Sequence, residues 1–226
     1  MKTGIIIQAR SDSRRFPKKI FNKIGNKNIL EHVISRIKKV KFKKIIIVAT
    51  KKKKSDEKVI KCAKKNRCYY FRGSENNVLQ RYFLTAKKFK IKNIIRVSAD
   101  SPFIDPKIIE KAYRIFSSSK YDYVSNIIKP TYPKGMSCEI FNFNCLKIAN
   151  YAKTSSFEKE HVTPYIIKNT RYFKIKNFSI NKKYRNYRFA IDRKQDLLFL
   201  RKLFNRISKS RLNSFNYKQL ISLKVK

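Results

Sequence analysis

The stretch GIIIQARSDSRRFPKK, residues 4–19, decides the fold, because an unbroken apolar run leads directly into a loop crowded with polar and charged side chains. A second apolar run, KIIIVAT, spans residues 44–50. Continuous β-branched runs of this length are typical of strands buried on both faces of a parallel sheet. Between the two runs, apolar residues recur at helical spacing from Ile29 to Ile37. The stretch therefore predicts the first strand of a βαβ unit.

The alternation of strand and helix continues through the first half of the chain. We expect strands over 68–71 and 93–98, and helices over 55–65, over 77–89 and from Asp105 onward, where Asp105 and Pro106 form a typical helix start. This order predicts an α/β fold with a mostly parallel, doubly wound sheet and helices on both faces. In such sheets ligands bind beyond the carboxyl ends of the strands, so residues that follow strands are candidates for a site.

One domain over residues 1–226 is expected, because the chain has no internal repeat and no Pro- or Ser-rich linker. Residues 1–126 form its regular half. Residues 127–226 are less regular, with a loop at 130–135, strands expected at 138–141, near 171–178 and at 187–191, and helices from residue 193 onward. We expect this second half to shape specificity.

Three features of the sequence bear on location. The apolar run near the N-terminus has only three residues before polar side chains, which does not resemble a secretory signal. No run of 18 uncharged apolar residues is present, so no membrane span is expected. The four cysteines have spacings that match no metal or redox motif. A cytoplasmic protein with buried, unpaired cysteines is therefore expected.

The charge of the chain is extreme, with 57 Lys and Arg against 14 Asp and Glu and a formal net charge of +43. Such a surplus suggests a polyanionic partner. However, the basic residues are spread over the whole chain and accompany many Ile, Asn, Phe and Tyr, the residues of A/T-rich codons. We therefore favour compositional drift, with nucleic acid bound only non-specifically.

The loop after the first strand contains five cations, Arg10, Arg14, Arg15, Lys18 and Lys19, and no glycine. It matches neither a Walker loop nor a dinucleotide-binding turn. Arg offers a bidentate fork to phosphate and Lys a point charge, so these cations could surround a polyphosphate. The alternative is a solvated charged loop.

Acidic residues are scarce, so those placed after strands carry information. Asp100 follows the strand at 93–98, and Asp192 follows the strand expected at 187–191. Two carboxylates that converge on one crevice would suit Mg²⁺, which completes its coordination with water and phosphate oxygens. Each could instead be a helix cap. Together with the cationic loop, they predict phosphoryl or nucleotidyl transfer by positioning and charge neutralisation.

Several ordered motifs between residue 4 and about residue 205 resemble the cytidylyltransferase family that includes the spore-coat polysaccharide protein SpsF. That group is similar to the acylneuraminate and 3-deoxy-octulosonate cytidylyltransferases. The opening matches the pattern IIQARxxSxRxPxK. The further matches are Leu30–Val33, Phe71–Glu75, Val78–Leu79, Arg81–Tyr82, Arg96–Pro106, Tyr121–Asn126, Tyr132–Pro133, Gly135, Glu160–Tyr165, Arg188–Asp192 and Asp196.

The resemblance implies a GT-A-like nucleotide-sugar transferase fold and a reaction in which a sugar-acid hydroxyl attacks CTP, with CMP transferred and pyrophosphate released. It implies a nucleotide-binding half at 1–126 and a sugar-binding half at 127–226 that could form a homodimer. Mg²⁺ would be held by Asp100 and Asp192. The residues implied to bind the nucleotide are Gln8, Ala9, Arg10, Ser13, Arg15 and Lys19, of which Arg10, Arg15 and Lys19 act in catalysis with Asp100.

On the acceptor side the resemblance implies Arg72, Glu139, His161 and Tyr165, although His161 could equally be structural. Three positions depart from the family pattern. Lys18 and Ala99 stand where glycine is usual, which could narrow the site or shift the loop. Ser137 stands where an acidic residue is expected, so the identity of the sugar is least defined.

Two other functions stay open at this stage. A polyanion-binding protein could use the basic surface with its 13 Tyr and 17 Phe, since stacking and phosphate contacts suffice for single strands. A uridylyl- or guanylyltransferase of the same fold would share the metal dependence and differ only in its nucleotide.

Overall fold

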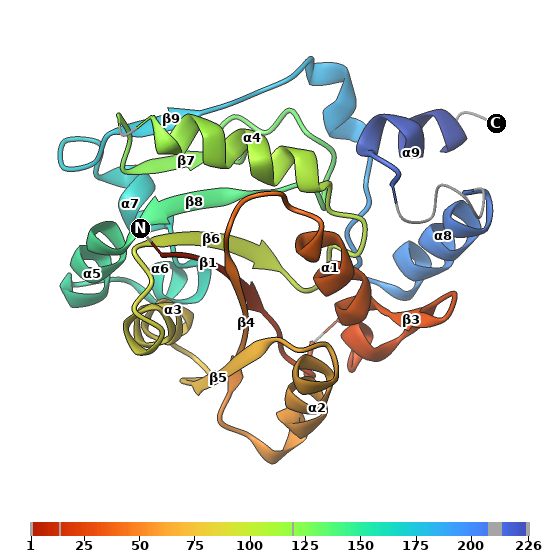
Figure 1. Cartoon of the computed structure of the whole chain (residues 1–226), viewed down its shortest axis with the longest axis horizontal. Helices are drawn as coiled ribbons and strands as arrows, with labels where there is room; N and C mark the ends of the chain where they lie inside the picture. Colours follow the sequence, from red (N-terminus) through yellow and green to blue (C-terminus); the bar gives the residue numbers. More distant parts are fainter. Residues whose placement is uncertain (1, 14, 119, 208–213, 225–226) are drawn as a thin grey trace.

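A seven-stranded sheet forms the centre of the computed structural model, which describes residues 2–13, 15–118, 120–207 and 214–224 (Figure 1). The strand order is β5-β4-β1-β6-β8-β7-β9. The strands are β1 (Thr3–Gln8), β4 (Ile45–Lys51), β5 (Tyr69–Gly73), β6 (Asn93–Ser98), β7 (Tyr123–Ser125), β8 (Glu139–Asn142) and β9 (Ile175–Asn177). A separate pair, β2 (Lys23–Ile24) and β3 (Lys27–Asn28), forms a small hairpin.

Only β8 runs against the others in this sheet. It pairs antiparallel with β6 and with β7, while β1, β4, β5 and β6 are mutually parallel and β9 is parallel to β7. The predicted mostly parallel α/β sheet is therefore confirmed. The carboxyl ends of the parallel strands lie at one edge, and β8 begins at that same edge because it is reversed.

Helices cover both faces of the sheet, as predicted. The helices are α1 (Ile29–Lys38), α2 (Glu57–Lys65), α3 (Val78–Lys88), α4 (Pro106–Ser117), α5 (Phe143–Tyr151), α6 (Ser156–His161), α7 (Pro164–Lys168), α8 (Lys194–Asn205) and α9 (Tyr217–Lys224). Short 3-10 turns are η1 (Lys19–Phe21), η2 (Lys54–Asp56) and η3 (Lys182–Asn186). In the described part of the chain, none of the helices is long and apolar enough to cross a membrane.

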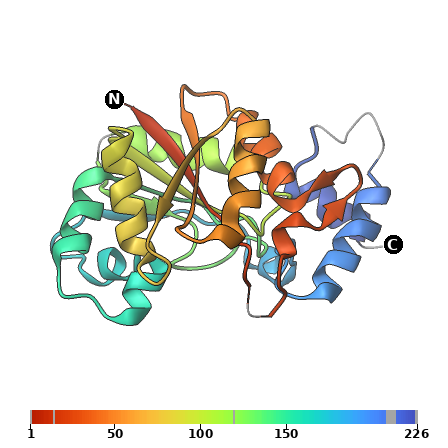
Figure 2. The same ribbon diagram turned by 90° about the horizontal axis from the view of Figure 1, so that it is seen from below.

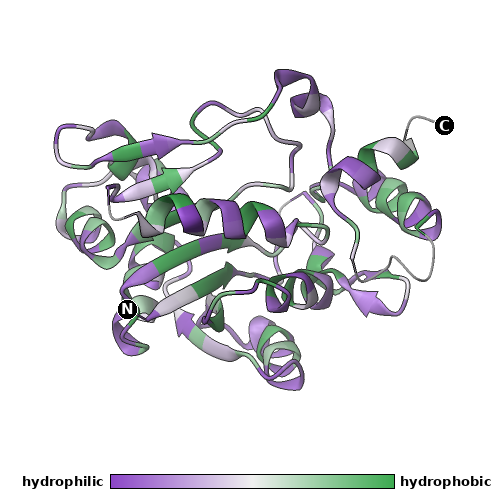
Figure 3. Cartoon of the chain, turned by 45° about the horizontal axis from the view of Figure 1, so that its top comes forward, coloured by the Kyte–Doolittle hydropathy of each residue, from purple (hydrophilic) through white to green (hydrophobic). Residues whose placement is uncertain are grey.

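The two cores show why β1 had to be apolar throughout. Ile5 and Ile7 belong to one buried cluster, which α1 and α4 cover, and Ile6 belongs to the other, which α3 and α5 cover. Successive side chains of a strand point to opposite faces, so both sets need apolar partners. Figure 3 shows the matching pattern on the helices, which carry hydrophobic and hydrophilic colours on different sides. All four cysteines are buried and unpaired, as expected.

The C-terminal helices α8 and α9 pack together at the end of the molecule that carries the β2–β3 hairpin (Figures 1 and 2). The buried Arg36 guanidinium of α1 donates hydrogen bonds to the carbonyls of Ile104 at 3.0 Å and Phe215 at 2.6 Å. These bonds tie the final segment to the first half of the chain.

The strand expected at 187–191 is wrong. The segment is extended, but it forms a single bridge, between Lys134 and Arg188. Its backbone bonds instead with loops, because Phe189 N–H donates to the Lys134 carbonyl at 2.7 Å and Ile191 N–H to the Asp100 carbonyl at 2.9 Å. The apolar pattern correctly predicted that Phe189 and Ile191 are buried, but the backbone of the segment hydrogen-bonds with loops and not with strands.

Lys18, where the resemblance implies glycine, adopts a left-handed backbone conformation with φ of 55°. Its N–H donates to the Ser11 carbonyl at 2.7 Å, which closes the loop just before η1. The side chain is exposed and does not narrow the site. The usual glycine is explained by this backbone conformation, which a residue with a Cβ adopts at a cost of about 1–2 kcal/mol.

We expect the substitution Lys18→Gly to stabilise the protein by about 0.5–1 kcal/mol, because glycine adopts the left-handed conformation without steric cost. Urea denaturation followed by circular dichroism measures the change. Lys18→Ala is the control, since it removes the same side chain but keeps the Cβ. Equal stability of the Gly and Ala variants would contradict the explanation.

Candidate active site

The candidate active site lies where β1 and β6 end side by side. Gln8 pairs with Ser98 in the parallel register of these two strands. The Ala99 N–H then donates to the Gln8 carbonyl at 3.2 Å, which keeps the chain segments that leave β1 and β6 together. The loop from Ala9 to Lys18 and the turn that begins at Ala99 therefore start as neighbours, as the strand-end rule predicts.

Lys19 brings the two predicted carboxylates together. Its Nζ lies 2.9 Å from Asp100 Oδ2 and 3.5 Å from Asp192 Oδ1, and it donates to the Ile191 carbonyl at 2.6 Å. One ammonium thus contacts the loop after β6 and the segment before α8, which are 92 positions apart in the sequence. Asp100 and Asp192 face one crevice, as the sequence predicts.

Asp192 is held by a cationic environment. Arg188 donates to its Oδ2, and Arg15 Nη2 lies 3.6 Å from its Oδ1. Partial burial by itself raises the pKa of Asp192, but the Arg188 hydrogen bond and the charges of Lys19, Arg188 and Arg15 lower it below its usual value. The carboxylate is therefore ionised at neutral pH and is available as an acceptor.

Asp196 fixes the segment that carries Asp192. Its Oδ2 accepts the backbone N–H groups of Asp192 at 2.7 Å and of Arg193 at 2.8 Å, and its Oδ1 accepts Arg188 Nε at 2.9 Å. Arg188 lies between two carboxylates, a role that the sequence reasoning missed. Its spacing from Asp192 and Asp196, at four and eight residues in a chain poor in acids, was the signal.

The donor set at the crevice fits Mg²⁺. Asp100 and Asp192 both contact a single cation, the Lys19 ammonium, and their side chains are 25% and 26% exposed. Mg²⁺ is commonly held by one or two protein carboxylates, with water and phosphate oxygens completing its shell. No cluster of three or more His, Cys, Asp or Glu side chains suited to a metal occurs among the described residues. The fit is therefore to a metal shared with a bound phosphate.

A cavity of about 650 Å³, which we call the loop cavity, opens beside the loop after β1. Its lining residues are Arg10, Asp12, Ser13, Arg15, Pro17, Glu75, Asn76, Val78, Ser156 and Glu160. Arg10, Ser13 and Arg15 are thus brought together at one cavity. Ala9 is not, because its side chain is 1% exposed and packs in the core. Arg14 lies outside the described residues.

Lys51 lies behind one wall of the loop cavity, where it pairs with the lining residues Asp12 and Glu75, and sequence reasoning missed this arrangement. The Lys51 side chain is 1% exposed, pairs with Asp12, and lies 2.9 Å from Glu75 Oε1. Hydrogen bonds from Lys53 and Lys51 lower the pKa of Glu75 to about 2. The signal was present, because Lys51 is the last residue of β4 while Lys52, Lys53 and Lys54 continue into the loop.

The start of the loop is anchored by Asp56, which is fully buried. Its Oδ1 accepts the Ser11 N–H at 2.9 Å and the Ser11 hydroxyl at 2.5 Å, and the Thr50 hydroxyl donates to its other oxygen. A carboxylate that accepts several hydrogen bonds is a rigid anchor. This anchor gives the glycine-free loop a defined beginning.

A second cavity, of about 360 Å³, is lined by both Asp100 and Asp192, and we call it the carboxylate cavity. Its other lining residues are Arg96, Ser98, Ser101, Ile127, Lys134, Gly135, Ser137, Glu139, Arg188 and Ala190. Ser137, where an acid is usual in the family, is part of this lining. Ala99, the other departure, is buried with 3% exposure and does not intrude.

Glu139 is buried, and its oxygens are already engaged. Oε2 accepts the Tyr123 hydroxyl at 2.9 Å and the Thr163 hydroxyl at 2.5 Å, and Arg96 donates to Oε1. Burial by itself lowers the pKa of Arg96, but pairing with Glu139 raises it. Glu139 thus lines the carboxylate cavity as expected of an acceptor-side residue, and it also positions the Arg96 guanidinium there; its contact with a sugar stays a prediction.

The other three expected acceptor-side residues are not brought to either cavity. Arg72 lies on the outer strand β5 and pairs with Glu57. His161 is exposed, and its ring lies 4.4 Å from that of Phe157. Tyr165 packs against the core cluster that α3 and α5 cover. These residues match the family motif by their order in the sequence, but the faces of the strand and helices that carry them direct their side chains away from both cavities.

Gly135 is required by its surroundings. It has φ of +94°, and a Cβ there would lie 2.7 Å from the carbonyl carbon of Phe189 and 2.8 Å from the nitrogen of Ala190. The loop can therefore press directly on the backbone that leads to Asp192. This close approach forms one side of the carboxylate cavity.

Comparison with known proteins is consistent with this geometry. An uncharacterised protein of Methanocaldococcus jannaschii is 37% identical over 177 residues, which cover 77% of this chain and 71% of the relative. The spore coat polysaccharide biosynthesis protein SpsF of Bacillus subtilis is 29% identical over 210 residues, covering 89% and 85%.

Solved structures show the same fold. A cytidylyltransferase from Leptospira borgpetersenii superposes with a TM-score of 0.92 at 33% identity, covering 99% of this chain and 93% of that one. A CMP:2-keto-3-deoxy-manno-octonic acid synthetase in complex with CTP has a TM-score of 0.68 at 15% identity, covering 91% and 99%. The family model described as "Cytidylyltransferase" matches residues 4–222, and the chain belongs to this family.

Proposed function

We propose that this cytidylyltransferase activates a sugar acid by transferring CMP from CTP to one of its hydroxyl groups, with release of pyrophosphate. The observation that carries the proposal is the convergence of Lys19, Asp100 and Asp192 in one crevice beside the cationic loop. This arrangement offers charge neutralisation and positioning, which are what nucleotidyl transfer needs.

The triphosphate is assigned to the space between the loop cavity and the carboxylate cavity. Arg10, Arg15 and Lys19 supply positive charge there, and Lys19 is held in place by three oxygen partners. Fixed cations stabilise the charge that grows on the leaving pyrophosphate. Asp100 and Asp192 would hold Mg²⁺, which supplies further charge neutralisation at the phosphates when bound.

The acceptor is assigned to the carboxylate cavity, whose lining contains three cations, Arg96, Lys134 and Arg188, and three carboxylates, Asp100, Asp192 and Glu139. Arg96 and Arg188 already pair with carboxylates of the chain. Lys134 has no ion-pair partner among the described residues, so its ammonium is the group that favours an acidic sugar over a neutral one. The names of the relatives support the same class, because one acts in spore coat polysaccharide biosynthesis and another is a 3-deoxy-manno-octulosonate cytidylyltransferase. We therefore propose a sugar acid destined for a surface glycan.

The direct test is pyrophosphate release from each of the four nucleoside triphosphates, against a panel of nonulosonic and octulosonic acids with and without Mg²⁺. We expect turnover with CTP that requires Mg²⁺. Asp100→Asn and Asp192→Asn should each lower kcat by about 10²–10³, as for loss of one charged group in a transition-state site. Glu57→Gln, at an exposed ion pair away from the cavities, should leave kcat unchanged.

Other outcomes of this assay would count against the proposal. Turnover with UTP or GTP in place of CTP would overturn the assigned nucleotide. No turnover, together with salt-sensitive binding of single-stranded RNA that is unaffected by Asp100→Asn, would favour a polyanion-binding protein.

Lys19→Ala should lower kcat/KM for CTP by about 10²-fold or more, because the ammonium that sits between the carboxylates and the phosphates is lost. Lys18→Ala is the matched control, since it removes the adjacent, exposed lysine. Its kcat/KM should change less than about threefold, in keeping with the small contribution of exposed charges. Similar losses in both variants would mean that general charge, and not the position of Lys19, is responsible.

Lys51→Met should raise the KM for CTP by about tenfold with a smaller effect on kcat. The variant leaves Asp12 and Glu75 at the loop cavity without their buried partner, so both carboxylates repel the triphosphate. Lys52→Met, at the exposed neighbouring position, is the control. Steady-state kinetics at fixed acceptor concentration separates the two constants, and an unchanged KM in Lys51→Met would refute this role.

A further inference from the structure

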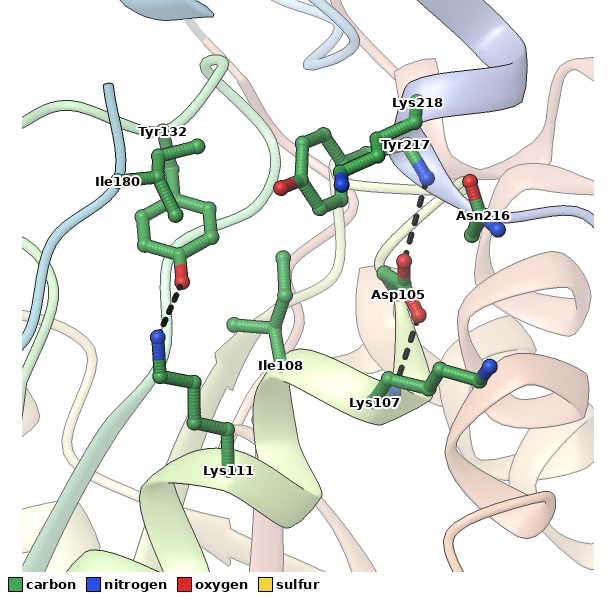
Figure 4. A pocket seen from close by; sticks show the side chains of 9 residues that line it. All are labelled: Asp105, Lys107, Ile108, Lys111, Tyr132, Ile180, Asn216, Tyr217 and Lys218. Atoms are coloured by element: carbon green, nitrogen blue, oxygen red, sulfur yellow. Dashed lines mark hydrogen bonds between the residues drawn. The ribbon is translucent and has the colours of Figure 1, made fainter. Parts of the chain in front are cut away.

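A third cavity, of about 300 Å³, lies between α4, α9 and the loop that follows β7 (Figure 4). We call it the tyrosine cavity after Tyr132 and Tyr217, whose rings form part of its wall. It shares no lining residue with the loop cavity or the carboxylate cavity. Any ligand here is therefore separate from the proposed reaction.

The tyrosine cavity is rich in hydrogen-bond donors. Lys107, Lys111 and Lys218 line it, and the only acidic residue in the lining is Asp105. Both oxygens of Asp105 are engaged by backbone, since Oδ1 accepts the Lys107 N–H at 3.0 Å and Oδ2 accepts the Tyr217 N–H at 3.1 Å. Asp105 thus holds the walls of the cavity together.

Tyr132 adds a buried donor to this set. Tyr132 is only 7% exposed, and its hydroxyl accepts a hydrogen bond from Lys111 Nζ at 3.5 Å. Figure 4 shows this hydroxyl and the Lys111 ammonium facing each other across the cavity wall. Burial raises the pKa of Tyr132 to about 12, so the hydroxyl keeps its proton. Among the described residues no acceptor takes that proton.

The rest of the lining is apolar. Ile108 lies in the centre of the view in Figure 4, and Ile180 is drawn next to Tyr132. The rings of Tyr132 and Tyr217 contact edge to face, with centroids 5.8 Å apart. A ligand here meets aromatic and aliphatic carbon on one part of its surface and cationic donors on another. Pockets of this size and composition are typical of small-molecule sites.

We propose that the tyrosine cavity is a second ligand site, which binds a small anion attached to a flat apolar ring. The anion is bound by Lys111, by the Tyr132 hydroxyl and by one of the two other lining lysines, Lys107 or Lys218. The ring of the ligand packs on Ile108 and the two tyrosines. Charge-assisted hydrogen bonds give such a ligand its orientation, and the apolar contact supplies the remaining affinity. The anion could be a carboxylate or a phosphate ester.

The two sources are separated by titrating the full chain with 2-naphthoate and with 2-naphthyl phosphate. The neutral analogue 2-naphthalenemethanol tests the need for charge, and inorganic phosphate tests the need for the ring. Protein carrying ¹³C in its tyrosine rings reports binding, because ligand ring currents shift the resonances of Tyr132 and Tyr217. Tyr132→Phe and Tyr217→Phe variants assign these signals.

We expect saturable shifts of both resonances with at least one of the two anionic ligands. The neutral analogue and inorganic phosphate should bind at least about tenfold more weakly, which corresponds to about 1.4 kcal/mol. Lys111→Gln should weaken binding about tenfold, and Tyr132→Phe less. The control Lys61→Gln removes an equal charge from an exposed position on α2 and should change the affinity less than about twofold.

Three results would overturn the proposal. The first is a shift that does not saturate for either anion, and the second is equal binding of the neutral analogue. The third is an equal effect of Lys111→Gln and Lys61→Gln, which would assign the binding to the overall charge of the chain. Because the readout is binding and not turnover, a failure here leaves the proposed transferase activity untouched.

Discussion

The ammonium of Lys19 is the point on which the arrangement of the candidate site depends. It contacts Asp100, Asp192 and the Ile191 carbonyl, so it joins the loop after β1 to the turn after β6 and to the segment before α8. Like charges on two carboxylates in one crevice repel each other unless a cation lies between them. Lys19 offsets this repulsion between the two carboxylates, and Arg188 and Arg15 add positive charge at Asp192.

The position of Lys19 depends in turn on a loop that has no glycine. Asp56 anchors the loop at Ser11, and the Lys18 N–H closes it on the Ser11 carbonyl. A glycine-rich loop reaches phosphate with its backbone, whereas this loop presents side chains from a rigid frame. The left-handed conformation of Lys18 is a local cost of that frame, and it directs the chain into η1 with Lys19 facing the crevice.

Much of this architecture is readable from the sequence because burial on two faces leaves a strong pattern. The runs at 4–8 and 44–50 became β1 and β4, and Asp105 caps α4 through the Lys107 N–H. Asp100 and Asp192 meet as predicted but by another route, because Asp192 follows an extended segment whose Ile191 N–H donates to the Asp100 carbonyl, and not a strand of the sheet. Arg72 and His161 line neither cavity, because a motif fixes the order of residues while the direction of a side chain depends on neighbours far away in the chain.

Lys51 and Arg188 show the opposite error. The sequence did not single them out as cations that pair with two carboxylates each, because basic residues are so common in this chain. In a chain with 57 basic residues, a buried lysine is not distinguishable from its solvated neighbours by type alone. What distinguishes Lys51 is its position at the buried end of β4 with two carboxylates within reach. Long-range contacts of this kind arise only when three separate loops meet.

The reversed direction of β8 has a consequence for how such an enzyme changes its preference. Because β8 begins at the edge where its neighbours end, the loop that enters it borders the carboxylate cavity through Lys134, Gly135 and Ser137. The lining of this cavity therefore combines residues that follow a parallel strand, such as Asp100, with residues that lead into a reversed one. A change in the loop before β8 would alter one wall of the cavity and leave the pairing of β1 with β6 in place.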